Sequence, residues 1–434
     1  MKSTTKEFAR YTSLNIAAML SLSCYVLADT FFIANWIGAY GLAALNFALP
    51  VFGAVIGVSL MLGIGGATKY TILKSQNDAA GANKIFTITI WLMLGFAAIF
   101  VIGGIFFAAA IAAAFGTYGE VFTMSKTYLQ VILISAPILM ANNVLVCFIK
   151  NDGAPRLAMF AMVSTSFTNI FLDYVFILQL DTGMFGAALA TTFAGVVGFI
   201  IIMYHFLRGR GALRLVRTQI TKAVSLGIFA IGLPSFVTEI SISTVLIVFN
   251  IIIFRLSGNI GVAAYGVIAN LLIVIVAIYN GIAQGIQPLI SKYYGHGDMA
   301  RAKQILRHAL MLMAVISVAV YAAVFLLAYP IAGAFNSEQN EILQALAVTG
   351  MRIYFIGGIF AGFNIIVSMY FTSTERPRPA HIISLLRGFV VILPLVFLLS
   401  HLGGITGVWS AFPITELIVC GIASVLYMRR SDVK

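Results

Sequence analysis

Residues 37–45 read IGAYGLAAL, and residues 257–265, which lie 220 positions further along the chain, read SGNIGVAAY. The match continues without a gap over residues 37–86 and 257–306, where nine of the fifty positions are identical. Nearly the same offset aligns DGAPRLA with ERPRPA, and GMFGAALA with GITGVWSA. Because three separate landmarks share one spacing, the sequence predicts a chain made of two similar halves.

The composition indicates which solvent surrounds these halves. Hydrophobic residues make up 61% of the 434 residues and charged residues only 9%, whereas soluble domains carry about 25% charged residues. A water-soluble protein with a charged surface is therefore excluded. The start MKSTTKEFAR leads directly into a long apolar run without a small-residue cleavage site, so we expect a membrane helix there and not a removable signal peptide.

A helix that spans a bilayer needs about 20 mostly apolar residues. Polar and glycine-rich breaks leave twelve such segments, six in each half: 11–36, 42–68, 85–114, 121–149, 157–179, 184–207, 223–254, 260–291, 305–331, 343–371, 380–400 and 404–428. The predicted fold is an all-α integral membrane protein with twelve transmembrane helices in two pseudo-symmetric, parallel six-helix bundles. The N-lobe is expected at residues 1–207, a cytoplasmic linker at 208–222 and the C-lobe at 223–434.

Basic residues are concentrated in alternate connections between these segments. By this count 23 of the 26 Lys and Arg lie on one side, including Arg208, Arg210, Arg387, Arg430 and Lys434. Because basic residues favour cytoplasmic connections, we expect a multi-pass protein of the bacterial cell (inner) membrane with both termini in the cytoplasm. The same asymmetry accounts for the net charge of +12 without nucleic acid as a partner.

Four acidic residues lie inside predicted spans, and none recurs at the matching position of the other half: Asp29, Asp173, Glu239 and Glu416. A residue that occurs in both halves is most simply structural, whereas one that occurs in a single half can carry chemistry. The position that matches Asp29 is Phe249. An ionised carboxylate inside a membrane costs several kcal/mol unless it is paired or solvated, so these four residues are candidates for function.

Asp29 and Asp173 are expected to lie at the same depth, roughly 12 Å inside the outer boundary at 1.5 Å per residue. Asn169 precedes Asp173 by one helical turn, and Thr191 lies at a similar depth in the next span. Carboxylate, amide and hydroxyl oxygens are groups that bind Na⁺ or accept H⁺. We therefore predict a cation-coupling site, and a possible Na⁺ site, at Asp29, Asp173, Asn169 and Thr191. The alternative is a structural role in hydrogen-bonding a kinked helix.

The second half contains further polar residues within its spans. Glu239 and Glu416 lie near mid-span, and Asn270 and Gln284 lie in the eighth span. We consider these four as residues of a substrate cavity, where a carboxylate can attract a cationic substrate. Packing between helices is the alternative for each.

No enzyme motif is present in the sequence. It contains no GxxxxGK[ST] phosphate-binding loop, and its five histidines do not have metal-ligand spacing. We therefore expect neither an enzyme nor an organic cofactor. Uphill transport would have to use an ion gradient, of H⁺ or Na⁺.

Several long stretches resemble one transporter family. They are YGVIANLLIVIVAIYNGIAQGIQPLISKYYGHGDMARAKQ, IGLPSFVTEIS, and NIFLDYVFI followed by GMFGAALATT. The chain resembles the multidrug and toxic compound extrusion (MATE) family over its entire length, and its bacterial DinF-like or MepA-like branch. The resemblance implies antiport of organic cations and drugs against H⁺ or Na⁺. It also implies an N-lobe cation site at Asp29, Asn169, Asp173 and Thr191, and makes Glu239 the match for a span-seven glutamate of the family.

One difference from part of that family concerns the C-lobe. NorM-type members carry an aspartate in span ten, whereas residues 343–371 contain no acidic residue, which argues against a C-lobe sodium site of that type. The expected partners are lipophilic or cationic drugs and membrane lipids, and the expected state is a monomer. Two alternatives stay open: a lipid-linked precursor flippase of the same superfamily and a passive channel.

Overall fold

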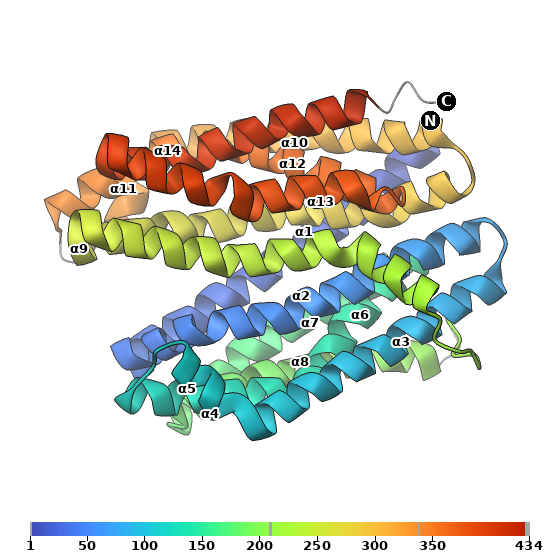
Figure 1. The fold of residues 1–434 in the computed structure, drawn as a ribbon, viewed down its shortest axis with the longest axis horizontal. Coiled ribbons are helices and arrows are strands. Elements are labelled where there is room, and N and C mark those ends of the chain that lie inside the picture. The colour runs from blue at the N-terminus through green and yellow to red at the C-terminus, as the bar shows by residue number, and fades with distance from the viewer. Residues whose placement is uncertain (1, 208–210, 337–338, 430–434) are drawn as a thin grey trace. The chain divides into compact units, whose positions relative to one another are not determined.

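The computed structural model describes residues 2–207, 211–336 and 339–429, and every regular element within these residues is a helix (Figure 1). Arg208 and Arg210 of the predicted linker, and Arg430 and Lys434, lie outside the described residues. The all-α prediction is confirmed for the rest of the chain.

Eleven elements form the first half; η marks a short π-helical stretch. They are α1 (Lys2–Phe32), η1 (Ile33–Ile37), α2 (Ala39–Ser75), α3 (Ala79–Ile102), η2 (Gly103–Phe107), α4 (Ala108–Ala114), α5 (Gly119–Ile134), α6 (Ala136–Asn151), α7 (Pro155–Asp173), η3 (Tyr174–Gln179) and α8 (Gly183–Leu207). The second half follows with α9 (Lys222–Gly295), α10 (Met299–Ala334), α11 (Glu341–Tyr354), α12 (Gly357–Ser373), α13 (Pro377–Leu385), η4 (Leu386–Val390) and α14 (Ile392–Met428).

The described helices supply enough membrane spans for the prediction. Eight helices are long and apolar enough to cross a bilayer. The number of candidate spans rises to ten when the bent pairs α5–α6 and α11–α12 are each counted as one span. Two of the ten, Lys222–Gly295 and Pro377–Met428, each contain two predicted spans. These divide at Gly258 and Gly404, where φ is +58° and +54° and the helix breaks. The ten candidates thus account for all twelve predicted spans.

Helix boundaries repeat in the two halves, as the internal match in the sequence predicts. In two pairs, the corresponding boundaries lie 220 residues apart, which is the offset of the internal match, and in a third pair they lie 222 residues apart. They are the starts of α3 and α10 (Ala79, Met299), the breaks between α5 and α6 and between α11 and α12 (Ser135, Phe355), and the starts of α7 and α13 (Pro155, Pro377).

Contacts divide the described chain into two units. One contains residues 17–240 and 291–299, and the other contains residues 1–16, 241–290 and 300–434. The boundaries between units fall inside α1, inside α9 and after the first residue of α10. The predicted lobes at 1–207 and 223–434 instead follow the duplication, and the lobe assignment stays a prediction. We refer to the first as the α2–α8 unit and to the second as the α10–α14 unit.

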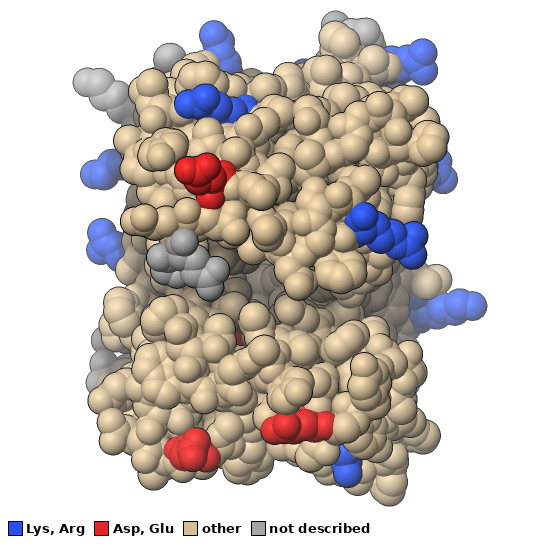
Figure 2. Space-filling model, turned by 90° about the vertical axis from the view of Figure 1, so that its left-hand side faces the viewer, with Lys and Arg blue, Asp and Glu red and all other residues tan. Residues whose placement is uncertain are grey.

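Each unit has features that bear on topology. In the α10–α14 unit, the start of α1 and the end of α14 lie at the same end (Figure 1). In the α2–α8 unit, an apolar core of residues from η1, α2, α5 and α8 lies toward the end where α4 connects to α5. Figure 2 views the molecule from the end where α4 connects to α5, and charged side chains are few and widely spaced on that face.

Candidate functional site

Two helices of the α2–α8 unit place a carboxyl group beside an irregular stretch of backbone. Asp29 lies in the last turn of α1 and precedes η1, and Asp173 is the last residue of α7 and precedes η3. A π-helical stretch widens the turn and often marks a functional site. Both predicted aspartates are therefore placed where two spans leave regular α-helical geometry.

Asn169 connects α7 to α8. Its side-chain amide donates to Thr191 Oγ1 at 3.3 Å. With the amide flipped, so that its oxygen and nitrogen exchange places, the nitrogen donates to Asp173 Oδ2 at 3.1 Å and the oxygen accepts from the Thr191 backbone N–H at 3.3 Å. Because the flipped orientation satisfies both ends of the amide, we assign it. Three of the four predicted cation-site residues thus form one connected group.

All four predicted cation-site residues are buried. The exposed fractions are 0% for Asp173, 1% for Asn169, 8% for Thr191 and 9% for Asp29. Oδ1 of Asp29 and Oδ1 of Asp173 have no hydrogen-bond partner among the described residues, and the two carboxyl groups interact electrostatically. A buried polar oxygen without a partner is costly. A proton or a small cation would remove that cost.

The described residues contain no group of three or more His, Cys, Asp or Glu side chains that could hold a metal ion. A sodium ion at Asp29 and Asp173 would therefore also need neutral oxygens, such as those of Asn169 and Thr191. Amide and hydroxyl oxygens are suitable ligands for a hard cation. The residues present fit either ion.

Two tyrosines complete this group and were not predicted. Tyr128 of α5 shares a hydrogen bond with Thr191 and lies within electrostatic reach of both aspartates. Tyr25 lies one turn before Asp29 and within reach of the same carboxyl groups. The spacing of four residues could have identified Tyr25. Tyr128 is far from the other residues in sequence, and the chain has 17 tyrosines.

Glu239 of α9 lies in the same unit as the aspartates. It is half-buried and lies within electrostatic reach of Tyr25. It packs against α2 at Gly57, where an added Cβ would come within 3.3 Å of Glu239 Cβ and 3.0 Å of the Phe236 ring. A side chain at position 57 would push Glu239 away from α2, so this glycine helps to set its position.

Glu416 of α14 lies in the α10–α14 unit and is 3% exposed. Arg387 of η4 binds it through Nε at 2.9 Å from both carboxylate oxygens and through its terminal nitrogen at 2.8 Å. Asn364 of α12 donates to Oε2 at 2.7 Å. The carboxylate is thus neutralised by the chain itself.

The position of Arg387 corrects the sequence analysis, which grouped this residue with the basic connections. It lies inside the candidate span Pro377–Met428. Residue 387 also lies in the predicted span 380–400, so the sequence contained this signal; it did not indicate the partner Glu416, which is 29 residues away. Asn270 and Gln284 are half-buried on α9, and their place in a substrate cavity stays a prediction.

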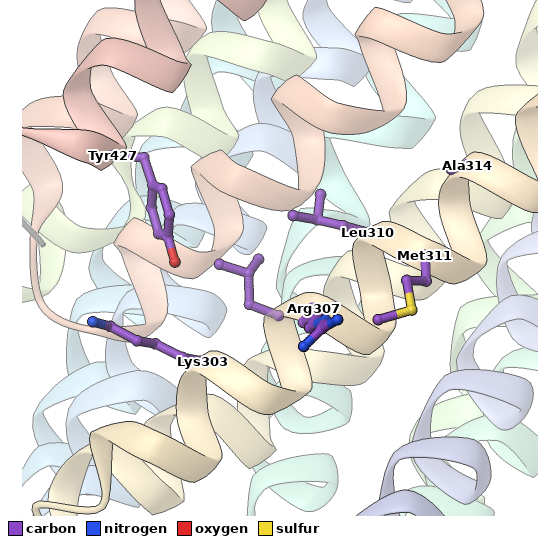
Figure 3. Close-up of a pocket in the computed structure, with 7 residues that line it drawn as sticks. Lys303, Arg307, Leu310, Met311, Ala314 and Tyr427 are labelled. Atoms are coloured by element: carbon purple, nitrogen blue, oxygen red, sulfur yellow. The ribbon is translucent and has the colours of Figure 1, made fainter.

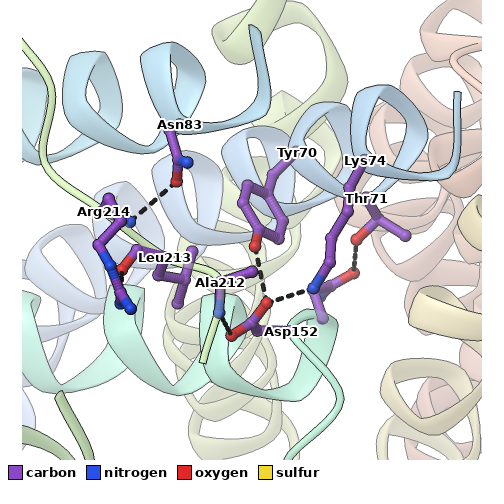
Figure 4. A network of polar contacts seen from close by, with 9 residues as sticks. Tyr70, Thr71, Lys74, Asn83, Asp152, Ala212, Leu213 and Arg214 are labelled. Carbon is purple, nitrogen blue, oxygen red and sulfur yellow. Dashed lines mark hydrogen bonds and ion pairs between the residues drawn. The ribbon is translucent and has the colours of Figure 1, made fainter. Parts of the chain in front are cut away.

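A separate polar network holds the predicted linker against the α2–α8 unit (Figure 4). Asp152, between α6 and α7, accepts hydrogen bonds from Tyr70 at 2.7 Å and from the Ala212 backbone at 2.8 Å, and forms an ion pair with Lys74. Further along, the Arg214 backbone donates to Asn83 at 2.8 Å. This network is satisfied within the chain, so we regard it as structural.

Similarity to known proteins was found for the sequence and for the fold. Residues 15–175 and 234–398 match the MatE family. The multidrug export protein MepA of Staphylococcus saprophyticus is 28% identical over 95% of this chain and 90% of its own length. The resemblance inferred from the sequence, including the MepA-like branch, is confirmed.

Two solved structures share the fold. A crystal structure described as MATE in complex with MaL6 has a TM-score of 0.93 and is 23% identical. An outward-facing conformation of a multidrug resistance MATE family transporter of the MOP superfamily has a TM-score of 0.91 and is 24% identical. Each comparison covers 99% of this chain and 96% of the solved one.

Proposed function

Because this chain belongs to the MatE family, we propose that it exports lipophilic and cationic drugs by secondary antiport, in exchange for H⁺ or Na⁺. Membership makes the chain a multi-pass membrane transport protein and not an enzyme. We place it in the bacterial cell membrane as a monomer, with both termini in the cytoplasm. The MepA relative, described as a multidrug export protein, supports the substrate class.

The observation that carries the proposal is that Asp29 and Asp173 each have a buried carboxyl oxygen without a hydrogen-bond partner among the described residues. In the outward-open state these groups take up one external ion. Neutralisation lowers the cost of keeping two carboxyl groups close together in an apolar surrounding. Helices α1, α7 and α8 then rearrange around the ion, and the drug leaves.

The return step uses the same groups. Drug binding from the cytoplasmic side favours release of the ion to the inside, and the two lobes, residues 1–207 and 223–434, rock about the linker at 208–222. Alternating access by rocking of two repeats is common among such transporters. Glu239 attracts cationic substrates from its position near Tyr25.

Transport of a fluorescent cationic dye into proteoliposomes tests the proposal, with a pH gradient and a Na⁺ gradient imposed separately. We expect uptake with one gradient and none without any gradient. Asp29→Asn should abolish uptake without changing the amount of inserted protein, because an amide cannot exchange a proton or neutralise a cation. Uptake at the normal rate by Asp29→Asn would refute the coupling role.

The same assay tests the passive channel, whereas the structure bears on the flippase. A passive channel predicts dye movement down its own gradient that neither ion gradient changes. A lipid-linked precursor flippase predicts basic residues in the substrate path. Arg387, which lies inside the candidate span Pro377–Met428, is neutralised by Glu416, and this pairing does not favour that alternative.

A further inference from the structure

A groove lies on the α10–α14 unit, between the first turns of α10 and the last turns of α14. It encloses about 700 Å³. Lys303, Arg307, Leu310, Met311 and Ala314 line it from α10, and Tyr427 lines it from α14 (Figure 3).

The lining of the groove changes from charged to apolar along α10. Lys303 and Arg307 are one turn apart near the start of the helix and are exposed, and they are followed by Leu310, Met311 and Ala314 on the same face. Figure 3 shows Tyr427 directed toward α10 near the two basic residues. Among the described residues, neither Lys303 nor Arg307 makes a hydrogen bond or ion pair. The groove therefore offers two cations that no described residue pairs, next to an apolar surface.

The matching positions in the first half have a different occupant. In the register of the internal match, Lys303 corresponds to Asn83 and Arg307 to Thr87, both on α3. There the linker covers the helix: the Arg214 backbone donates to Asn83 at 2.8 Å and the Val216 backbone donates to Thr87 at 3.0 Å. Thus, where the first half has two uncharged side chains that accept hydrogen bonds from the linker backbone, the second half has the cations Lys303 and Arg307.

The charge of the chain's own end argues against a similar occupant on α10. Residues 429–434 read RRSDVK, with three basic residues and one acidic residue, so their net charge does not complement that of Lys303 and Arg307. An anionic occupant with an apolar body complements the groove. The bilayer supplies such molecules, and α10 is well exposed to it, since only 17% of its most apolar window is buried.

We propose that this groove binds an anionic phospholipid from the leaflet that borders the end where α1 begins and α14 ends. The headgroup phosphate contacts Lys303, Arg307 and the Tyr427 hydroxyl, and an acyl chain lies over Leu310, Met311 and Ala314. Basic residues at a membrane surface attract anionic lipids, and each contributes to the affinity. The proposal does not depend on the substrate or on the coupling ion.

Native mass spectrometry of the full chain, titrated with phosphatidylglycerol or with phosphatidylcholine of the same acyl length, tests the proposal. We expect phosphatidylglycerol to be retained preferentially. The double variant Lys303→Gln/Arg307→Gln should weaken that retention by about tenfold or more. Equal retention of the two lipids, or no effect of the double variant, would overturn the proposal.

Matched variants separate charge from folding. Lys84→Gln removes an exposed cation near the start of α3 and should leave retention unchanged. Lys303→Arg/Arg307→Lys keeps both charges and should preserve the preference for phosphatidylglycerol. If Lys84→Gln weakens retention as much as the double variant, the effect is one of net charge and the groove is not the site.

Two further arms identify the occupant. Excess inorganic phosphate should not displace phosphatidylglycerol, because it lacks the acyl chain; displacement would assign a phosphate site instead. A photo-crosslinker at position 311 of the full chain should label phospholipid. Labelling of the chain's own C-terminal segment, or loss of labelling on addition of a cationic dye, would assign the groove to that segment or to a drug and would refute the lipid.

Discussion

Glu416 has a full set of partners, since Arg387 and Asn364 bind both of its carboxylate oxygens. Asp29 and Asp173, in contrast, each keep one buried oxygen without a hydrogen-bond partner among the described residues. A carboxylate that already has a tethered cation gains little from an external ion, whereas an open carboxylate gains much. We infer that ion coupling uses the aspartate pair, and that Glu416 stabilises the α10–α14 unit.

A double-mutant cycle on Arg387 and Glu416 tests this inference. Arg387→Gln should destabilise the protein strongly, because removing one partner of a buried ion pair costs about 3–5 kcal/mol. The double variant Arg387→Gln/Glu416→Gln should be less destabilised than Arg387→Gln alone, because no unpaired charge is left. Thermal unfolding of the detergent-solubilised protein measures both.

Transport by the double variant supplies the decisive comparison. We expect it to keep gradient-driven dye uptake, since Asp29 and Asp173 are untouched. A well-folded double variant without coupling would mean that Arg387 or Glu416 takes part in ion exchange, and would contradict the inference.

The sequence identified the candidate acidic residues because each occurs in only one of the two halves. It identified only some of the residues that contact them. Asn169 and Thr191 could be predicted as partners because they are close to Asp173 in sequence or in depth. The roles of Tyr128 and Arg387 as partners could not be predicted, because their contacts join helices that are far apart along the chain. Such partners depend on how helices pack, which one sequence does not specify.

At the scale of elements, hydropathy identified the twelve spans, because a bilayer requires about 20 apolar residues for each crossing. It did not indicate the four π-helical stretches, η1 to η4, because a single wide turn leaves composition unchanged. Two of them follow Asp29 and Asp173, and a third carries Arg387. Three of the four π-helical stretches thus follow or carry an intramembrane charge, whereas η2 does not.

At the same scale, we predict that Asp152 holds the linker against the α2–α8 unit. The side chain of Asp152 is 3% exposed and binds Tyr70, Lys74 and the Ala212 backbone. Asp152→Asn removes the charge that strengthens these bonds, which contribute about 1.5–3 kcal/mol each when a charged group takes part. We expect hydrogen–deuterium exchange of the backbone at residues 211–216 to become about tenfold faster or more.

Glu120→Gln provides the control, since Glu120 is an exposed residue in the first turn of α5 and has no part in the network. It should leave exchange at residues 211–216 unchanged. Unaltered exchange in Asp152→Asn would show that other contacts, such as Asn83 with the Arg214 backbone, suffice to hold the linker.

At the scale of the molecule, the duplication indicates the order of the elements, and the distribution of basic residues indicates their orientation in the membrane. The repeated helix boundaries support two halves with the same order of elements. The basic residues concern orientation, because they predict which connections face the cytoplasm. Correcting the place of Arg387 removes one member of that set and leaves the asymmetry intact.

Labelling of single cysteines tests the orientation directly, in a background where Cys24, Cys147 and Cys420 are replaced by Ala. Tyr118, in the α4–α5 connection, is 85% exposed, and Gln219 of the linker is also exposed. A membrane-impermeant maleimide should label Tyr118→Cys in intact cells and Gln219→Cys only after permeabilisation, because basic connections stay in the cytoplasm. The reverse pattern would place both termini outside and would reverse the direction of transport inferred for the aspartate pair.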